Sequence, residues 1–140
     1  MQYTKEEILE RCNQMCKNTL METLEIEFVD FTDQTITAKM PVTAKVHQPD
    51  EVLHGGASVA LAESVGSAAA VIFLGQKNVQ VRGIEISAKH VKSVRDGEVY
   101  AKAQIIHKGR TTQLWQIRIT DHQNQLISLI KLTTLTLYQD

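Results

Sequence analysis

The sequence predicts an α+β protein in which antiparallel strands curve around one long apolar helix. Two observations carry this prediction: residues 55–75 form a nearly uncharged apolar run, and apolar residues alternate with polar ones on both sides of it. A helix that is apolar on almost every face has to be buried, and a sheet wrapped around it provides that burial. With 140 residues, the chain has the length of a single domain covering 1–140.

Each element is indicated by its own pattern. Thr4 and Glu7 form a capping box ahead of an amphipathic helix that we expect over 4–17. Period-two alternation predicts strands, in chain order, over residues 26–31, 35–41, 79–91, 98–107, 111–120 and 126–137. Turn-forming residues separate neighbouring strands, and residues 42–53 form a long polar loop. The order is therefore helix, two strands, central helix and four strands.

Composition and charge narrow the classes of partner. The formal net charge is −1, and the few aromatic residues are not interleaved with a basic stripe, which argues against nucleic-acid binding. Residues 55–75 are long enough to cross a membrane, but Glu63 and three serines interrupt them, so we expect a buried helix and no membrane partner.

The two cysteines, Cys12 and Cys16, lie four apart in the first predicted helix. This spacing holds the side chains too far apart for an unstrained disulfide, and neither a second pair nor nearby histidines complete a metal site. We expect two buried thiols, no metal and no disulfide. Together with a polar N-terminus that lacks the apolar core of a signal peptide, this favours a cytoplasmic location.

Glu63 is the first candidate for catalysis, because it is the only charged residue between His54 and Lys77. A carboxylate on an apolar helix has to be paired, desolvated or functional. It can serve as a general base or a nucleophile, or it can be a structural glutamate bonded to backbone or serine. Ser67, one turn later, lies on the same face and is placed to orient the carboxylate.

The start of the apolar helix is the second candidate. Gly55 and Gly56 let a ligand approach backbone N–H groups at the positive end of the helix dipole, where a developing oxyanion is stabilised. Gln48 and His54 add side-chain donors nearby. The glycines alone are also compatible with a tight junction between loop and helix.

The spacing of these two candidates has a structural consequence. Gly55 and Glu63 are eight residues apart, or roughly 12 Å along a helix. One acyl carbon cannot contact both groups of the same chain. If both serve one reaction, they come from different subunits across a two-fold axis, and we expect a homo-oligomer.

The motifs Gln48-Pro49, Leu53-His54-Gly55-Gly56-Ala57-Ser58, Leu61-Ala62-Glu63-Ser64 and Gly66-Ser67 closely resemble those of the bacterial hotdog-fold acyl-CoA thioesterases. The similarity is greatest to the branch that includes dihydroxynaphthoyl-CoA hydrolases and enterobactin proofreading thioesterases. It continues through Gly83-Ile84-Glu85-Ile86, His90-Val91-Lys92-Ser93, His107-Lys108-Gly109-Arg110 and Trp115-Gln116-Ile117, and thus covers nearly the whole chain.

The resemblance implies a hotdog fold, with six antiparallel strands around a central helix, dimers that commonly pair into tetramers, and active sites between subunits. It implies that Glu63 is the base or nucleophile, that the Gly55 N–H, Gln48 and His54 bind the thioester oxygen, and that Ser67 supports Glu63 or water. The implied binding residues for the substrate and its CoA phosphates are Gly83, His90, Val91, Lys92, Ser93, Arg95, His107, Lys108, Gly109, Arg110, Thr111 and Thr112. No cofactor is implied beyond the CoA of the substrate.

One departure bears on the substrate. Relatives usually follow the Gln-Pro pair with an aromatic residue and glycine, whereas this chain has Asp50 and Glu51. We expect hydrolysis of an aromatic or medium-sized acyl-CoA or acyl-carrier thioester, with strictly aromatic substrates less favoured than hydrolysis itself. Two alternatives stay open: a hydratase or dehydratase that pairs His54 with Glu63, and a non-catalytic acyl-CoA-binding module.

Overall fold

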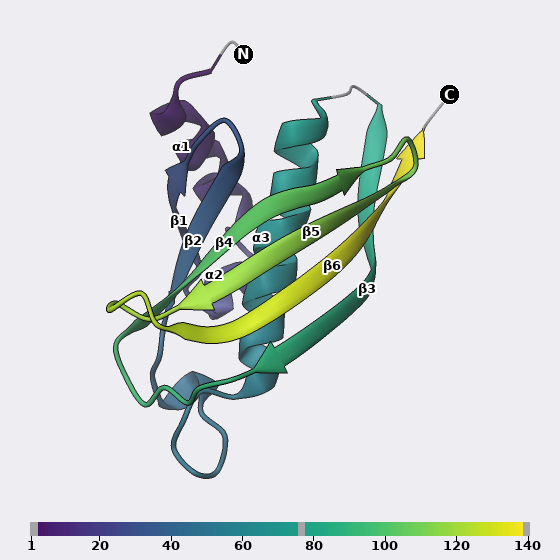
Figure 1. The fold of residues 1–140 in the computed structure, drawn as a ribbon. Coiled ribbons are helices and arrows are strands. Elements are labelled where there is room, and N and C mark those ends of the chain that lie inside the picture. Colours follow the sequence, from purple (N-terminus) through teal and green to yellow (C-terminus); the bar gives the residue numbers. More distant parts are fainter. Residues whose placement is uncertain (1–2, 76–77, 139–140) are drawn as a thin grey trace.

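The computed structural model describes residues 3–75 and 78–138, and its elements follow the predicted order (Figure 1). The helices are α1 (Lys5–Met15), the short α2 (Leu20–Thr23) and the long α3 (Gly55–Leu74), with a single 3-10 turn at Ala44–Val46. The strands are β1 (Glu27–Phe31), β2 (Thr35–Pro41), β3 (Val79–His90), β4 (Glu98–Lys108), β5 (Thr112–Thr120) and β6 (Leu126–Tyr138).

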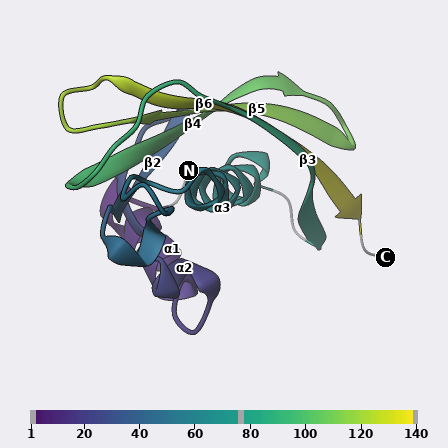
Figure 2. The ribbon, with the colours of Figure 1, turned by 90° about the horizontal axis from the view of Figure 1, so that it is seen from below.

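The six strands form one antiparallel sheet in the order β1-β2-β4-β5-β6-β3. The sheet arches over α3, while α1 and α2 lie beside that helix away from the arch (Figure 2). This arrangement confirms the predicted α+β class and the sheet wrapped around a central helix. After α3 the chain returns through β3, which pairs with the last strand, β6, and so occupies the sheet edge opposite β1.

Small residues set the close packing of α3 against the sheet. The buried face of the helix consists of Ser58, Leu61, Ala62, Val65, Gly66, Ala69 and Ala70, which recur at helical spacing. A Cβ added to Gly66 would lie 2.5 Å from Leu132 Cδ2, so this position brings the helix backbone onto β6. Ile117 of β5 faces the same position from the sheet, with its Cδ1 3.4 Å from that added Cβ, and is fully buried. The core is thus built between one helix face and the concave side of the sheet.

The other face of α3 is less covered than the sequence predicts for a helix apolar all round. Val71 is 55% exposed in the isolated chain. Within the described ranges, α3 is the one helix with the length and mean hydropathy, 1.8, of a membrane-crossing segment. It nevertheless packs against five strands, β2 to β6, as the core helix of a sheet protein does.

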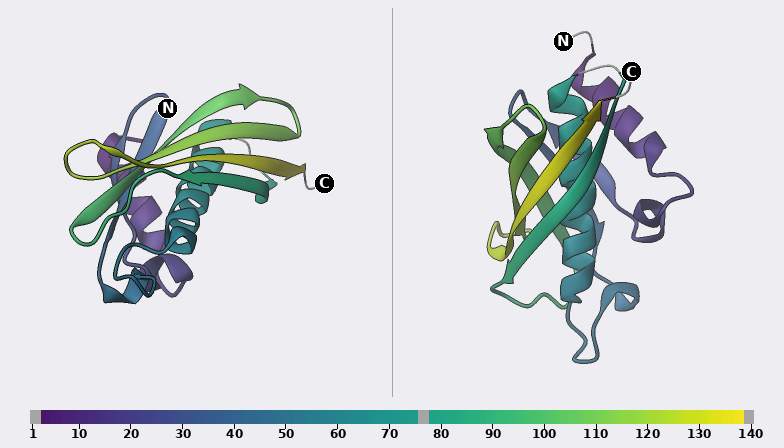
Figure 3. Two further views of the ribbon diagram at one scale, coloured as in Figure 1. Left: turned by 60° about the horizontal axis from the view of Figure 1, so that its bottom comes forward. Right: turned by 90° about the vertical axis from the view of Figure 1, so that its right-hand side faces the viewer.

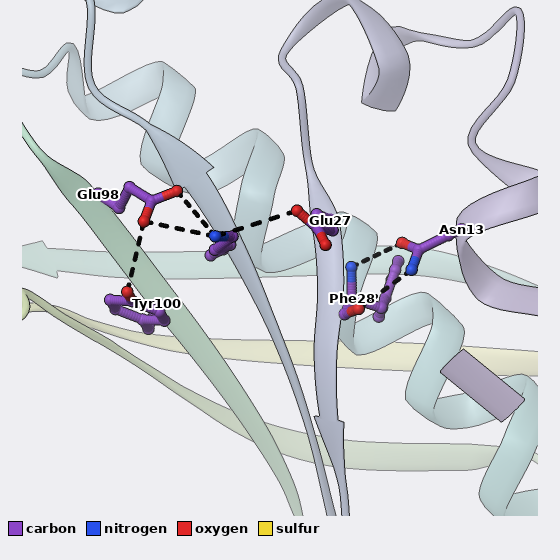
Figure 4. Close-up of polar contacts among 6 residues, drawn as sticks. Asn13, Glu27, Phe28, Glu98 and Tyr100 are labelled. Carbon is purple, nitrogen blue, oxygen red and sulfur yellow. Dashed lines mark hydrogen bonds and ion pairs between the residues drawn. The ribbon is translucent and has the colours of Figure 1, made fainter. Parts of the chain in front are cut away.

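Helix α1 is fixed to the sheet through Asn13 (Figure 4). The Phe28 backbone N–H donates to Asn13 Oδ1 at 2.7 Å, and Asn13 Nδ2 donates to the Phe28 carbonyl at 3.1 Å. Such a reciprocal pair satisfies both backbone groups of a strand residue, and each bond contributes about 1 kcal/mol. The helix is therefore held in one register against β1.

Cys12 lies in α1, and Cys16 caps the C-terminal end of that helix. Both thiols are buried and free, as predicted. Burial raises the pKa of the Cys12 thiol to about 11. The Cys16 thiol donates to the Cys12 carbonyl at 3.3 Å, and burial also raises its pKa. Both thiols therefore behave as small apolar groups. A cytoplasmic location stays a prediction.

Strand β3 is a long edge strand (Figure 3). One side of it pairs with β6 over nearly its whole length, with an irregularity between Gly83 and Glu85. Its other side has no strand beside it in the described parts of the chain, and Ile84 is 53% exposed. Exposed edges of this length usually need protection from uncontrolled pairing.

Candidate active site

A pocket of about 310 Å³ opens where α3 begins. Its walls are formed by the loop before α3, the end of β3, the segment directly after β3, and the start of β6. The predicted site residues that line it are Gln48, Gly55, His90, Val91, Lys92 and Ser93. Six predicted residues from three separate chain segments are therefore brought together.

The loop that carries Gln48 is anchored to the segment after β3. His47 Nε2 lies 2.8 Å from the Arg95 carbonyl, and the Leu53 N–H donates to the Val94 carbonyl at 2.8 Å. The Gln48 side-chain carbonyl accepts a hydrogen bond from the Asp50 N–H. This contact occupies the acceptor of the Gln48 amide, and no described residue takes its Nε2 donors. Those donors are available to a ligand.

His54 caps the N-terminus of α3. The Gly56 N–H donates to His54 Nδ1 at 2.8 Å, so Nδ1 is the unprotonated ring nitrogen and Nε2 remains for another partner. In the described ranges, no carbonyl or side chain accepts from the Gly55 N–H. The predicted oxyanion donor is thus unengaged, while the predicted role of His54 is limited to its Nε2 side.

His90 closes one side of the pocket against Gly55. A Cβ added to Gly55 would lie 2.8 Å from His90 Nε2, so only glycine lets the ring approach the helix start this closely. His90 Nδ1 lies 2.7 Å from Ser128 Oγ, and the Ser128 side chain is 1% exposed. Ser128 therefore fixes the ring orientation that directs Nε2 toward Gly55.

Glu63 occupies a different position, at the middle of α3 and against β3. A Cβ added to Gly83 would lie 2.7 Å from Glu63 Oε2 and 3.5 Å from its Cδ. The glycine therefore creates the space in which the carboxylate rests. Glu63 is partly buried, and across residues 3–75 and 78–138 no group donates a hydrogen bond to its carboxylate or forms an ion pair with it. Its oxygens remain open to solvent in the single chain.

Ser67 does not contact Glu63 through a hydrogen bond. It lines a second, apolar cavity between α1 and α3, together with Ser64. Ser67 thus lies one helical turn after Glu63, but it lines the cavity on the α1 side of α3. Its predicted role as a partner of Glu63 or of water stays a prediction.

The remaining predicted binding residues form the β4–β5 hairpin: His107, Lys108, Gly109, Arg110, Thr111 and Thr112. The Gly109 N–H donates to the Thr112 carbonyl at 2.9 Å, which closes the turn, and the Arg110 guanidinium lies 5.5 Å from the Tyr138 ring centroid. This hairpin and the His90–Ser93 segment lie at opposite ends of the sheet (Figure 1). One chain therefore does not assemble the predicted phosphate site.

Sequence reasoning missed Ser128 and the polar residues that support the hairpin. Ser128 faces His90 only because β3 pairs with β6, and no local pattern announces that register. The hairpin rests on buried Gln113, whose Nε2 donates to the Gly109 carbonyl at 3.1 Å and whose Oε1 accepts from Thr134 at 2.9 Å. Gln113 interrupts the apolar face of β5, and a polar residue at such a position indicates a buried hydrogen-bond network. No cluster of three metal-binding side chains occurs in the described ranges.

The family model described as "Thioesterase superfamily" matches residues 50–128. The chain is 41% identical to the 1,4-dihydroxy-2-naphthoyl-CoA hydrolase of Escherichia coli K12, over 90% of this chain and 92% of that protein. It is 42% identical to the proofreading thioesterase EntH of Cronobacter turicensis, over 90% and 91% of the two chains.

Solved structures agree with these sequence matches. A thioesterase from Haemophilus influenzae superposes with a TM-score of 0.90 at 40% identity, covering 99% of this chain and 93% of that one. A thioesterase from Staphylococcus aureus gives a TM-score of 0.80 at 38% identity, covering 84% and 97%. Structures of that chain carry alanine in place of a glutamine or of a glutamate fifteen positions later, the spacing that separates Gln48 from Glu63. With these matches over nearly its whole length, the chain belongs to the thioesterase superfamily and is one of its hotdog-fold hydrolases.

Proposed function

We propose that this protein hydrolyses an acyl-CoA or acyl-carrier thioester to a free acid and a thiol, with Glu63 as the catalytic carboxylate. The observation that carries the proposal is the environment of Glu63: a partly buried carboxylate on an apolar helix, with no hydrogen-bond or ion-pair partner among the described residues, held against Gly83. Solvent reaches its oxygens in the single chain, and a carboxylate that bonds to no neighbouring residue adds no contact that holds the fold together, so its place on an apolar helix is better explained by chemistry.

Two routes use the same carboxylate. As a general base, Glu63 takes a proton from water while the water oxygen attacks the thioester carbon. As a nucleophile, its oxygen attacks that carbon directly, and water later hydrolyses the resulting anhydride. In both routes the carbon–sulfur bond breaks, and the thiolate leaves and takes up a proton.

The donors at the start of α3 suit the other half of the reaction. The thioester oxygen gains negative charge in the tetrahedral intermediate, and the unengaged Gly55 N–H and Gln48 Nε2 are donors for it. Loss of one such donor typically lowers the rate on the order of a hundredfold. Positions 48 and 63 also match the spacing of the two residues replaced in the Staphylococcus aureus thioesterase.

We further propose that the working site forms between two copies of the chain. Gly55 and Glu63 of one chain are separated by about 12 Å along α3, and the outer edge of β3 is exposed beside Glu63. A second copy that pairs along this edge through a two-fold axis perpendicular to β3 would place its β3 antiparallel to the first. Its β4–β5 hairpin would then lie near the His90–Ser93 segment, which unites the two basic groups for the CoA phosphates.

The thiol released from acyl-CoA substrates by the wild type and by Glu63→Gln tests the proposal. The variant keeps the shape of the side chain, so we expect kcat to fall by at least about a hundredfold with unchanged oligomeric mass. Glu10→Gln makes the same change at an exposed carboxylate on α1 and should retain full activity. A folded wild type that binds acyl-CoA tightly without releasing thiol would instead identify a binding module, and an enoyl or hydroxyacyl thioester product would identify a lyase.

A further inference from the structure

The backbone of the β4–β5 connection is fixed carbonyl by carbonyl. Its three residues are Gly109, Arg110 and Thr111, and each of their carbonyls accepts a hydrogen bond from β5 or β6. The donors are, in the same order, Gln113 Nε2 at 3.1 Å, the Tyr138 hydroxyl at 2.6 Å and the Thr136 N–H at 2.8 Å. The turn is therefore tied to the two strands that follow it.

A fixed carbonyl also fixes the N–H of the same peptide unit. The peptides of the described chain are trans, so the C=O and N–H of each unit point in opposite directions. The Gly109 carbonyl faces Gln113, which turns the Arg110 N–H away from Gln113. The Arg110 carbonyl orients the Thr111 N–H in the same way. Among the described residues, no group accepts from either N–H, and the side chains of Lys108 and Arg110 are exposed.

Gln113 is itself held in a single orientation. It is 1% exposed, and its amide oxygen is identified by its neighbours. Trp115 Nε1 can only donate, and it donates to the Thr134 hydroxyl at 2.9 Å, so that hydroxyl gives its own hydrogen to Gln113 Oε1 at 2.9 Å. The Thr136 hydroxyl donates to the same oxygen at 3.2 Å. The amide nitrogen therefore has to face the Gly109 carbonyl.

The strand ladder alone does not determine how this turn is arranged. Pairing of β4 with β5 is irregular between Ile105 and His107, directly before the turn. Glycine also permits rotations of the peptide that follows it, which other residues restrict. Rotation of the Gly109–Arg110 peptide would bring its carbonyl outward and its N–H inward. An outward N–H binds an anion and an outward carbonyl repels one, and the bond from Gln113 selects the first arrangement.

We propose that Gln113 is a positioning residue for substrate binding, which holds the Gly109–Arg110 peptide so that the Arg110 N–H is offered to a phosphate of CoA. This inference rests on the proposed hydrolase function, in which the hairpin of one chain serves the site of another. Gln113 acts only through the hairpin, and the hairpin carries none of the groups proposed for the chemical step. Its effect is therefore confined to substrates that carry the phosphates.

The test compares an acyl-CoA with the same acyl group on N-acetylcysteamine, a thiol without phosphates. Gln113→Met removes the donor and keeps a side chain of similar length. We expect it to raise KM for the acyl-CoA about tenfold with kcat changed less than about twofold, which is the scale of one or two lost hydrogen bonds. The N-acetylcysteamine thioester should keep its wild-type kcat/KM, whereas a smaller fraction of folded enzyme would lower both. Gln116→Met makes the same substitution on the outer, half-buried face of β5 and should change neither substrate.

Amide hydrogen exchange of the wild-type protein is a second test and needs no variant. The Arg110 N–H should exchange rapidly in the free protein. Added CoA should slow that exchange at least about tenfold, because a bound phosphate accepts from this group. Pantetheine, which has no phosphate, should leave it unchanged.

An unchanged KM in folded Gln113→Met, or an equal loss with both substrates, would overturn the positioning role and leave the hydrolase proposal intact. Exchange at Arg110 that CoA does not slow would overturn it as well. No thiol release from either substrate by the wild type would overturn the hydrolase proposal. The affinities of the wild type and Gln113→Met for CoA, measured by calorimetry, would then decide the role of Gln113: weaker binding by the same factor supports it, and equal binding overturns it.

Discussion

Replacement of Gly83 by alanine is a direct perturbation of Glu63 that does not alter the carboxylate itself. The new Cβ would lie 2.7 Å from Glu63 Oε2, whereas ordinary contacts of a Cβ begin at 3.4 Å. The carboxylate therefore has to move by about 0.7 Å or more. Displacements of about 1 Å in a catalytic group lower rates on the order of a hundredfold, so we expect kcat/KM to fall between about 10- and 100-fold.

Stability should change little, because the side chain that moves ends in a flexible carboxylate and alanine is favoured over glycine in a strand by roughly 0.5–1 kcal/mol. Thiol release gives kcat/KM, and thermal unfolding gives stability. Ser87→Ala, an exposed position on the same strand, is the control and should behave as the wild type. Full activity in a folded Gly83→Ala protein would refute the catalytic position assigned to Glu63.

Three further predictions concern other parts of the molecule. Ser128→Ala frees the His90 ring, so we expect about a tenfold loss of kcat/KM, restored in Ser128→Thr and absent when His90→Ala is already present. Glu51 has a φ of 64°, a left-handed backbone conformation that strains any residue with a Cβ. Glu51→Gly should therefore raise the free energy of unfolding by about 0.5–1 kcal/mol in denaturant titrations. A lower free energy of unfolding would contradict this backbone strain. The pKa of Cys12 is raised from 9.0 to about 11 in the folded protein, so the protonated thiol stabilises the fold fully below pH 9, and this contribution is lost as the pH rises toward 11. Cys12→Ala removes the titrating group and should flatten the fall of the unfolding free energy over this pH range, by ~2 kcal/mol at most.

The fold could be predicted because its signals are local. Strands with clean alternation and a helix as apolar as α3 leave few arrangements, and all six strands occur where the pattern indicates. The four-residue α2 was missed, since one turn capped by Thr19 has no hydrophobic period to detect. The first helix ends at Met15, two residues earlier than expected. The strand order was not readable, because the pairing of β3 with β6 depends on the path of the chain after α3.

Individual residues of the candidate site could be predicted from the sequence, but most of the contacts between them could not. The Gly55 backbone and the Gln48 side chain lie together as expected, because both belong to one loop-to-helix junction. The contact of Glu63 with Gly83 and that of His90 with Ser128 depend on how β3 lies against α3 and β6, which no single segment specifies. Sequence reasoning therefore named the chemistry but not the contacts that position it.

The claim that hydrolysis needs Glu63 from one chain and Gln48 from another is tested most directly by complementation. Glu63→Gln and Gln48→Ala, each expected to be nearly inactive alone, are co-expressed with different tags, and the mixed oligomers are purified through both tags. In a mixed dimer one site carries both changes and the other carries neither, so we predict that about half of the sites recover wild-type thiol release. Mixed oligomers no more active than the two separate variants would contradict a site shared between subunits.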